Sequence, residues 1–260
     1  MTTQENGESA GRSGMTVGRI TLTDERTRAP KASERVAQEI VRHIVQGGLA
    51  TGDRLPMESA MVEQYGVSRT SLREALRLLE VQGLISLKPG PGGGPVVGTV
   101  DPSHLARTAA LYFLLSGAVY DDVMRAQVQL ESTCARLAAS NREREERMRP
   151  WLQQTMPDDL RGYRDLTIGF HGAVYELADN PVLSLLTQAV THIVTRHVIM
   201  TMDPVELRPL IVKDHVRLAK VIARGDAAEA ERLMAAHFQR QHDHFAARWP
   251  SRLQEKVEWR

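Results

Sequence analysis

The sequence predicts a mainly α-helical protein, in which a winged helix-turn-helix is followed by an antiparallel bundle of six to seven helices. Two observations support this. Between residues 55 and 97, two short helical patterns joined by a tight turn lead into a hairpin rich in Gly and Pro. Beyond residue 102, apolar residues recur only at helical spacing, in segments of roughly 15–23 residues separated by Gly, Pro and Asn.

The first domain is predicted over residues 31–98. The preceding residues, 1–30, are rich in Gly, Ser, Thr and charge, and we expect a disordered tail because they bury too little apolar surface. Ser33 is expected to cap the first helix, which ends at Gly47. Its inner face carries Val36, Ile40, Val41 and Ile44.

The next two helices form the helix-turn-helix. Pro56 suits the start of the first of them, because its missing N–H would be unpaired there. Gly66 suits the left-handed residue that ends this helix, and Ser68 is the expected N-cap of the next. The buried face of that second helix is predicted from the spacing of Leu72, Ala75, Leu76 and Leu79.

A β-hairpin wing follows this helix. Gly83 ends the helix, and residues 84–88 have the apolar, β-favouring character of a short strand. Residues 89–95 are nearly all Gly and Pro, so they are expected to turn the chain, and Val96 and Val97 suit the returning strand.

The second helix of the motif is a candidate DNA-recognition helix. The formal net charge is only +1, so a local cluster must supply the attraction to DNA. Arginines and hydroxyl side chains in the first turns of such a helix can contact base edges and phosphates in a major groove. An ordinary helical hairpin with solvated charges is the alternative interpretation. The candidate DNA-binding residues are Ser68, Arg69, Thr70, Ser71, Arg73, Arg77, Lys88 and Gly90.

The second domain is predicted over residues 102–250 as a helical bundle. The expected helices cover residues 105–115, 121–140, a shorter piece near Trp151, 159–178, 181–202, 204–224 and 226–248.

Three histidines on three of these helices share the apolar faces. They are His171, His215 and His237. Each is expected to point inward, where an unpaired imidazole costs about 1–3 kcal/mol. The residue pattern leaves two interpretations open, either core histidines with satisfied hydrogen bonds or a shared metal site for an ion such as Zn, Ni or Mn. His192 and Arg196 lie one turn apart on another helix, where the guanidinium could bind a carboxylate.

The composition is that of a globular protein in a reducing compartment. Cys134 is the single cysteine, so no internal disulfide is possible and a cytoplasmic location is expected. No apolar run is expected to span a membrane, and the polar N-terminus does not resemble a signal peptide.

The segments at residues 55–58, 65–76 and 79–85 carry a resemblance to a known family. They read LPME, YGVSRTSLREAL and LEVQGLI, and across residues 33–98 the chain resembles the GntR family of bacterial transcriptional regulators. The resemblance implies that Arg69 and Arg73 contact the operator and that the wing near Gly90 approaches the minor groove. Ser59 stands where family members often carry Arg, which implies a lost contact.

The helical domain resembles the ligand-sensing FCD domain of the FadR-like branch of this family. The similar segments include Leu130-Glu131, Phe170-His171 and the stretch from His215 to His237. The resemblance implies dimerisation, an effector pocket, and one divalent ion held by three histidines and an Asp. Thr167 occupies the Asp position, and Asp165 lies about 600° round the helix from His171, facing elsewhere. The candidate pocket residues are Thr167, His192, Arg196 and Gln241.

The sequence therefore predicts a cytoplasmic, homodimeric, ligand-responsive transcriptional regulator, a repressor in the favoured interpretation and not an enzyme. It would bind a pseudo-palindromic operator in double-stranded DNA and a small carboxylate effector, with or without a divalent metal. Two alternatives remain. One is a three-histidine metal hydrolase, although Glu176, five residues after His171, is a poorly placed base. The other is an architectural DNA-binding protein without a ligand.

Overall fold

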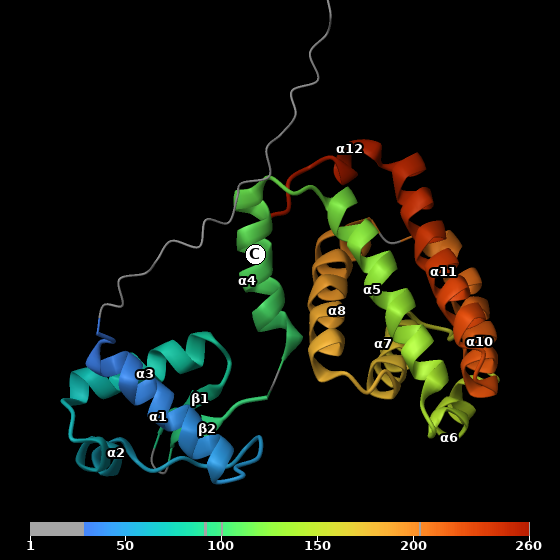
Figure 1. Ribbon diagram of the computed structural model, residues 1–260. Coiled ribbons are helices and arrows are strands. Elements are labelled where there is room, and N and C mark those ends of the chain that lie inside the picture. The colour runs from blue at the N-terminus through green and yellow to red at the C-terminus, as the bar shows by residue number, and fades with distance from the viewer. Residues whose placement is uncertain (1–28, 91–92, 100, 203, 260) are drawn as a thin grey trace, which may run out of the picture. The chain divides into compact units, whose positions relative to one another are not determined.

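The computed structural model describes residues 29–90, 93–99, 101–202 and 204–259 (Figure 1). The tail expected over residues 1–30 lies, except for its last two residues, outside this described part. The described residues are mainly helical, with one two-stranded antiparallel sheet near the N-terminal end. The predicted fold class is confirmed.

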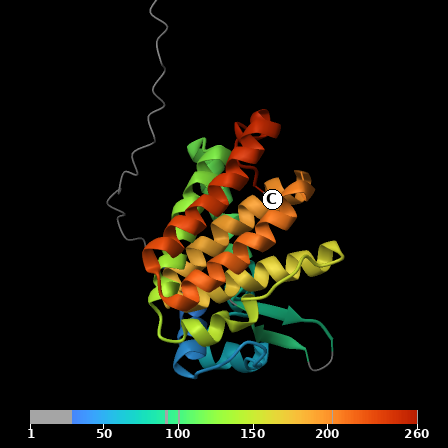
Figure 2. The same cartoon turned by 90° about the vertical axis from the view of Figure 1, so that its right-hand side faces the viewer.

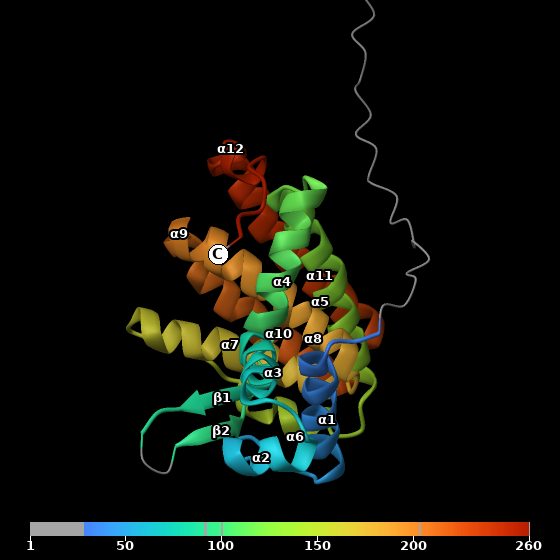
Figure 3. The same ribbon diagram turned by 90° about the vertical axis from the view of Figure 1, so that its left-hand side faces the viewer.

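Three helices make up the helix-turn-helix domain: α1 (Ala32–Gln46), α2 (Glu58–Tyr65) and α3 (Arg69–Val81). They surround one apolar core, as the periodicity predicts (Figure 3). The predicted face of α3 is buried, with its four apolar residues at most 3% exposed. The buried core residues are Val36, Ala37, Ile40, Leu55, Met61, Leu72, Ala75, Leu76, Leu79, Ile85 and Val97.

Two of the predicted helix boundaries are confirmed. Gly66 adopts a left-handed conformation, with φ of 60°, and ends α2. The hydroxyl of Ser68 then accepts the N–H of Ser71 at 3.1 Å, so Ser68 is the N-cap of α3. Together they fix the direction in which the arginine-bearing helix leaves the turn.

The expected N-cap of α1 is wrong. The cap is Lys31, and Ser33 is a buried residue of the first turn. The side chain of Glu34 accepts the backbone N–H of Lys31 at 3.0 Å, so the third residue of the helix reaches back to the N-cap as in a capping box.

The wing is an antiparallel hairpin of β1 (Ile85–Lys88) and β2 (Gly94–Val97). Ile85 pairs with Val97 beside the core, and Lys88 pairs with Gly94 at the far end (Figure 3). Gly90 follows the first strand with φ of 96°, a conformation that favours glycine.

The helical domain begins with α4 (Pro102–Ser116) and α5 (Tyr120–Ser140). The central helices α5 and α11 pack along each other (Figure 1), and α10 and α11 lie side by side among the orange and red helices of Figure 2. The remaining helices are α6 (Arg144–Met148), α7 (Leu160–Leu177), α8 (Pro181–Val194), α9 (Met200–Met202), α10 (Arg208–Arg224), α11 (Ala227–Arg248) and α12 (Pro250–Leu253), with single turns at Arg149–Trp151 and Val205–Leu207.

The bundle has two apolar clusters. One contains Phe170, Leu218 and Phe238, contributed by α7, α10 and α11, and it surrounds the three histidines. The other lies toward the opposite end of α5 and contains Tyr120, Ile193 and Phe245.

The packed bundle extends beyond the predicted boundary at residue 250. Val257 is fully buried, and its N–H donates to the carbonyl of Ala118 at 3.0 Å. The N–H of Tyr120 in turn donates to the carbonyl of Glu255 at 3.1 Å. A short segment after α12 therefore completes the second core, and nothing in its polar sequence indicates this pairing.

One helical segment, Pro181–Met202, is long and apolar enough to cross a membrane by length and composition, contrary to the sequence-based expectation. It includes α8, a π-helical turn (Thr195–Ile199) and α9. Ala189, Ile193 and Val198 are buried in the second core, so the apolar character reflects packing within the bundle.

Candidate nucleic-acid interface and metal centre

The candidate DNA-contacting side chains lie on one face of α3. Arg69, Thr70, Arg73 and Arg77 are exposed, whereas the opposite face of the helix is buried in the core. This arrangement presents cationic and hydroxyl groups from the first three turns of a helix to solvent. It is the arrangement by which a recognition helix contacts DNA.

One of these arginines already has a partner. Nε of Arg73 donates to Oε2 of Glu58, at the start of α2, at 2.9 Å. Both side chains are exposed, at 69% and 38%, so water and phosphate can compete for the guanidinium.

The wing presents a second cationic position. Lys88 is exposed at the end of β1, and Gly90 is exposed in the turn that follows. Pro91 and Gly92, between Gly90 and the returning strand, lie outside the described residues.

The three histidines predicted from periodicity are brought together. His171, His215 and His237 come from α7, α10 and α11, and each offers one ring nitrogen such that these atoms all lie within 4.8 Å of one another. They are 7%, 1% and 2% exposed. Phe170 stacks on His215, with ring centroids 4.3 Å apart, and walls one side of the cluster.

The partners of the three rings differ. Nδ1 of His237 lies 3.2 Å from Oδ2 of Asp214, and the amide of Gln241 donates to Nε2 of the same ring at 2.9 Å. The proton of His237 is therefore on Nδ1 and the lone pair on Nε2. Within the part of the chain that the structure describes, neither nitrogen of His215 has a hydrogen-bond partner.

The electrostatics of the cluster favour neutral imidazoles at His215 and His237. Burial holds the pKa of His215 well below its usual value, and the neighbouring histidines lower it further. Burial also lowers the pKa of His237, although the contact with Asp214 opposes this effect. Neutral imidazoles are the form that binds metal ions.

A buried carboxylate that the sequence did not indicate as a site residue adjoins the cluster. Glu131 on α5 is fully buried, and its Oε1 accepts the hydroxyls of Tyr175 at 2.5 Å and Thr191 at 2.8 Å. Its Oε2 lies 3.3 Å from Nδ1 of His171. The spacing of Glu131 from Gln127 and Ala135 on the inner face of α5 is the signal that would have indicated it.

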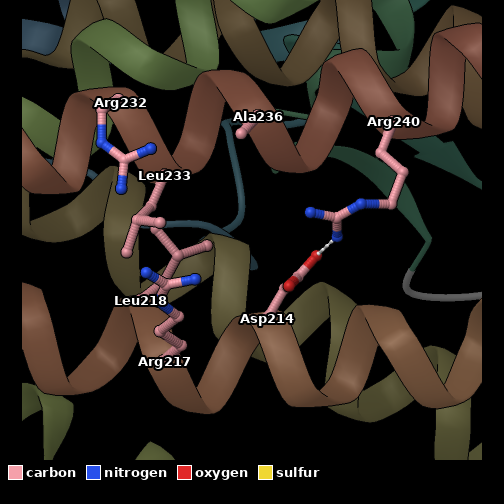
Figure 4. A pocket seen from close by; sticks show the side chains of 7 residues that line it. All are labelled: Asp214, Arg217, Leu218, Arg232, Leu233, Ala236 and Arg240. Atoms are coloured by element: carbon pink, nitrogen blue, oxygen red, sulfur yellow. Dashed lines mark hydrogen bonds and ion pairs between the residues drawn. The ribbon is translucent and has the colours of Figure 1, made fainter.

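Asp214 is a second carboxylate that the sequence did not indicate, and it lies between the buried His237 and the exposed Arg240. Its carboxylate accepts a hydrogen bond from Arg240 on α11, as Figure 4 shows, while contacting His237 on its inner side. The two helices flank a cavity of about 120 Å³ that is lined by apolar side chains, three arginines and Asp214. It is lined by Asp214, Arg217, Leu218, Arg232, Leu233, Ala236 and Arg240 (Figure 4).

The other candidate pocket residues are dispersed. Gln241 lies at the cluster, against His237. Thr167 is half-buried one turn before His171, and its hydroxyl donates to the carbonyl of Tyr163 at 2.9 Å. Arg196 is exposed, and burial lowers the pKa of His192, although the charge of Asp101 at the start of α4 opposes this effect. The described contacts of His192 and Arg196 thus do not include the histidine cluster.

The residues present fit a divalent metal ion. Three imidazole nitrogens converge, and ions such as Zn bind imidazole at about 2.0–2.1 Å. The amide of Gln241 would have to turn away from Nε2 of His237 for an ion to bind that nitrogen. Metal-binding histidines commonly direct their other ring nitrogen at a carboxylate. Glu131 and Asp214 stand in that position, at 3.3 Å and 3.2 Å from Nδ1 of His171 and His237.

Two family models match separate parts of the chain. The model for bacterial regulatory proteins of the gntR family matches residues 32–93. The model for the FCD domain matches residues 122–240.

Individual proteins agree with these assignments. The Uxu operon regulator of Haemophilus influenzae is 28% identical over 219 residues, covering 79% of this chain and 78% of that protein. The transcriptional repressor NanR of an Enterobacter species is 26% identical over 221 residues, covering 80% and 82%. The solved structure of a GntR protein from Streptococcus agalactiae has the same fold, with a TM-score of 0.55 and 16% identity over 81% of this chain and 99% of that one.

Proposed function

This chain belongs to the GntR family of bacterial regulatory proteins and carries an FCD domain, and we propose that it is a cytoplasmic, homodimeric repressor controlled by a small carboxylate metabolite. The family consists of transcription regulators, so the hydrolase alternative is not supported. The proposal adds to the family assignment the sign of regulation, the oligomeric state, the effector class and the role of the three histidines.

In this proposal, each protomer places α3 in one half-site of a pseudo-palindromic operator. A twofold protein dimer matches twofold DNA symmetry. Arg69 and Arg73 contact base edges or phosphates, and Lys88 on the wing contacts phosphate. Arg73 exchanges Glu58 for DNA as it binds.

The effector site in this proposal is centred on the histidine cluster with one divalent ion per chain. The observation that carries it is the convergence of three buried imidazoles, one of which, His215, has no hydrogen-bond partner for either nitrogen among the described residues. Leaving such groups unpaired is costly, and an ion would satisfy one of the two nitrogens. When bound, a divalent ion offers a coordination position that a carboxylate oxygen can occupy.

The proposed FadR-like assignment follows from the same histidines, together with the FCD match. The effector acts on DNA binding only if it binds the two arrangements of the dimer with different affinity. Thr167 leaves the site without a carboxylate on α7, so an anionic effector meets less repulsion there than an Asp would cause.

The test selects a DNA site for the protein and then asks which carboxylates release the protein from that site. Purified protein is used to enrich binding sequences from a random-sequence DNA pool, and affinity for the enriched site is measured with a panel of small carboxylates, each with and without EDTA. We expect a pseudo-palindromic site, and at least one carboxylate that weakens binding in the absence of EDTA only. Enrichment of no sequence would contradict the regulatory function. Affinity unaffected by every carboxylate would favour the architectural alternative.

A further inference from the structure

We propose that Glu131 supplies the negative charge that the metal site lacks at Thr167, and that it acts through His171 as a positioning residue. The inference rests on the proposed metal-dependent function. In this inference, the anionic group of the site is on α5 and not on α7. Its charge lies beside one histidine, whereas an Asp at position 167 would bind the ion itself.

Glu131 is a buried carboxylate with only one of its two oxygens hydrogen-bonded. It is fully buried, and its Oε1 is occupied by two hydroxyl donors, Tyr175 and Thr191. Its Oε2 completes no hydrogen bond within the described part of the chain. A buried carboxylate with a free oxygen is unfavourable unless a cation or a further donor lies nearby.

His171 adjoins this second oxygen of Glu131. Nδ1 of the ring and Oε2 of Glu131 are 3.3 Å apart, a distance at which a small turn of the ring aligns an N–H with the oxygen. A proton held on Nδ1 leaves the lone pair on Nε2, which is the nitrogen available to an ion.

The neighbouring histidine provides an internal comparison. His237 has its Nδ1 against Asp214 and its lone pair on Nε2, as the donor from Gln241 requires. Glu131 lies at a similar distance from Nδ1 of His171, but neither of these two atoms completes a hydrogen bond among the described residues. In the proposal, the ring of His171 turns toward Oε2 when the ion binds. Two carboxylates from different helices then orient two of the three imidazoles, while His215 has neither.

The residues on α7 cannot take this role. The hydroxyl of Thr167 is neutral and is committed to the carbonyl of Tyr163. Asp165 is 73% exposed and lies near Arg161, on the outer face of the helix. Glu131 is thus the carboxylate that adjoins His171.

The test compares metal affinity in the full-length wild type and Glu131→Gln. Affinity for Zn²⁺ is measured by competition with a chromophoric chelator, and the absorption spectrum of the Co²⁺ form reports the geometry around the ion. We expect Glu131→Gln to bind Zn²⁺ about 10–100-fold more weakly and to change the Co²⁺ spectrum. Glu176→Gln is the matched control, because Glu176 is exposed and pairs with Arg147 on the surface.

The metal-free protein separates positioning from a purely structural role. Loss of the Glu131 charge should leave the thermal midpoint of the metal-free protein unchanged or raised, since Gln keeps an oxygen for the two hydroxyls and removes a buried charge. A lowered midpoint with wild-type Zn²⁺ affinity would mean that Glu131 only supports the fold, and would overturn the proposal.

A second substitution tests the exchange between helices directly. Thr167→Asp places a carboxylate one turn before His171 on the same face of α7. In the Glu131→Gln background it should restore Zn²⁺ affinity to within about threefold of the wild type, reversing the loss above. Wild-type protein that binds no metal would refute the proposed site itself, whereas unchanged affinity in Glu131→Gln would refute only this inference.

Discussion

Nε of Arg73 lies 2.9 Å from Oε2 of Glu58, which ties the recognition helix α3 to the start of α2 before any DNA is present. Exposed ion pairs of this kind contribute little to stability, commonly about 0–1 kcal/mol. The pair therefore orients the guanidinium in the absence of DNA. Breaking it costs little free energy when a phosphate or base edge replaces the carboxylate.

Replacing either Arg69 or Arg73 by Ala should cost about 1–3 kcal/mol of binding to the selected operator. Each substitution removes a cationic donor from the exposed face of α3 while leaving the buried face intact. Fluorescence anisotropy with labelled operator measures the loss, and Arg161→Ala on α7, 91% exposed, is the control. Operator affinity retained in both variants would remove the recognition role from α3.

Lys88→Ala should weaken binding to operator and to unrelated DNA by a similar factor. A lysine on the wing contacts phosphate as a point charge, so its loss should lower the salt dependence of binding by about one unit of slope. Titrations at several salt concentrations provide the slope. A change confined to the operator would instead assign Lys88 to base contact.

Ser68→Ala should destabilise the helix-turn-helix domain by about 1 kcal/mol, within a range of 0.5–2, because the N–H of Ser71 loses its acceptor. Ser68→Gly should destabilise the domain by only a few tenths of a kcal/mol, since Gly is tolerated at an N-cap. Chemical denaturation of both variants gives the comparison. Equal losses would show that the hydroxyl does not cap α3.

Acid should weaken the helical domain through Asp121. Burial alone would raise the pKa of this carboxyl, but hydrogen bonds from His242 and Arg125 hold the pKa below its ordinary value. The folded state therefore binds the proton less tightly than the unfolded chain does. The resulting stabilisation is present above the ordinary pKa of about 4 and is lost as the pH falls through and below it.

Thermal midpoints measured between about pH 3 and pH 6 test this contribution. The wild type should lose stability across the lower part of that range. Asp121→Asn should be less stable than the wild type at pH 6 and show a shallower fall. Parallel curves for the two proteins would assign the acid sensitivity to other groups.

The helix-turn-helix could be predicted from the sequence because its signals are local. Gly66, Ser68 and the apolar spacing of α3 each define a boundary or a face within a few residues of chain. Ser33 is not the cap, because the helix already begins at Ala32 and Glu34 reaches back to the N–H of Lys31. Serine at a helix start is compatible with both positions.

Only the histidines of the candidate metal centre could be predicted from the sequence, and its two carboxylates could not. The three histidines follow from helical periodicity, since each lies on an apolar face. Glu131 and Asp214 acquire their significance from distances across 40 and 23 residues of chain, to His171 and His237, which no local pattern encodes. The pairing of Val257 with Ala118 is hidden for the same reason.

The metal content of the purified protein tests the central proposal most directly. Elemental analysis of the wild type, before and after EDTA, is compared with that of His215→Ala, which removes the imidazole with no other hydrogen-bond partner among the described residues. We predict about one Zn, Ni or Mn ion per chain in the wild type and none in the variant. A wild type that contains no metal, and that no added divalent ion stabilises against heat, would contradict a metal-dependent sensor and leave the three histidines as hydrogen-bonding groups of the core.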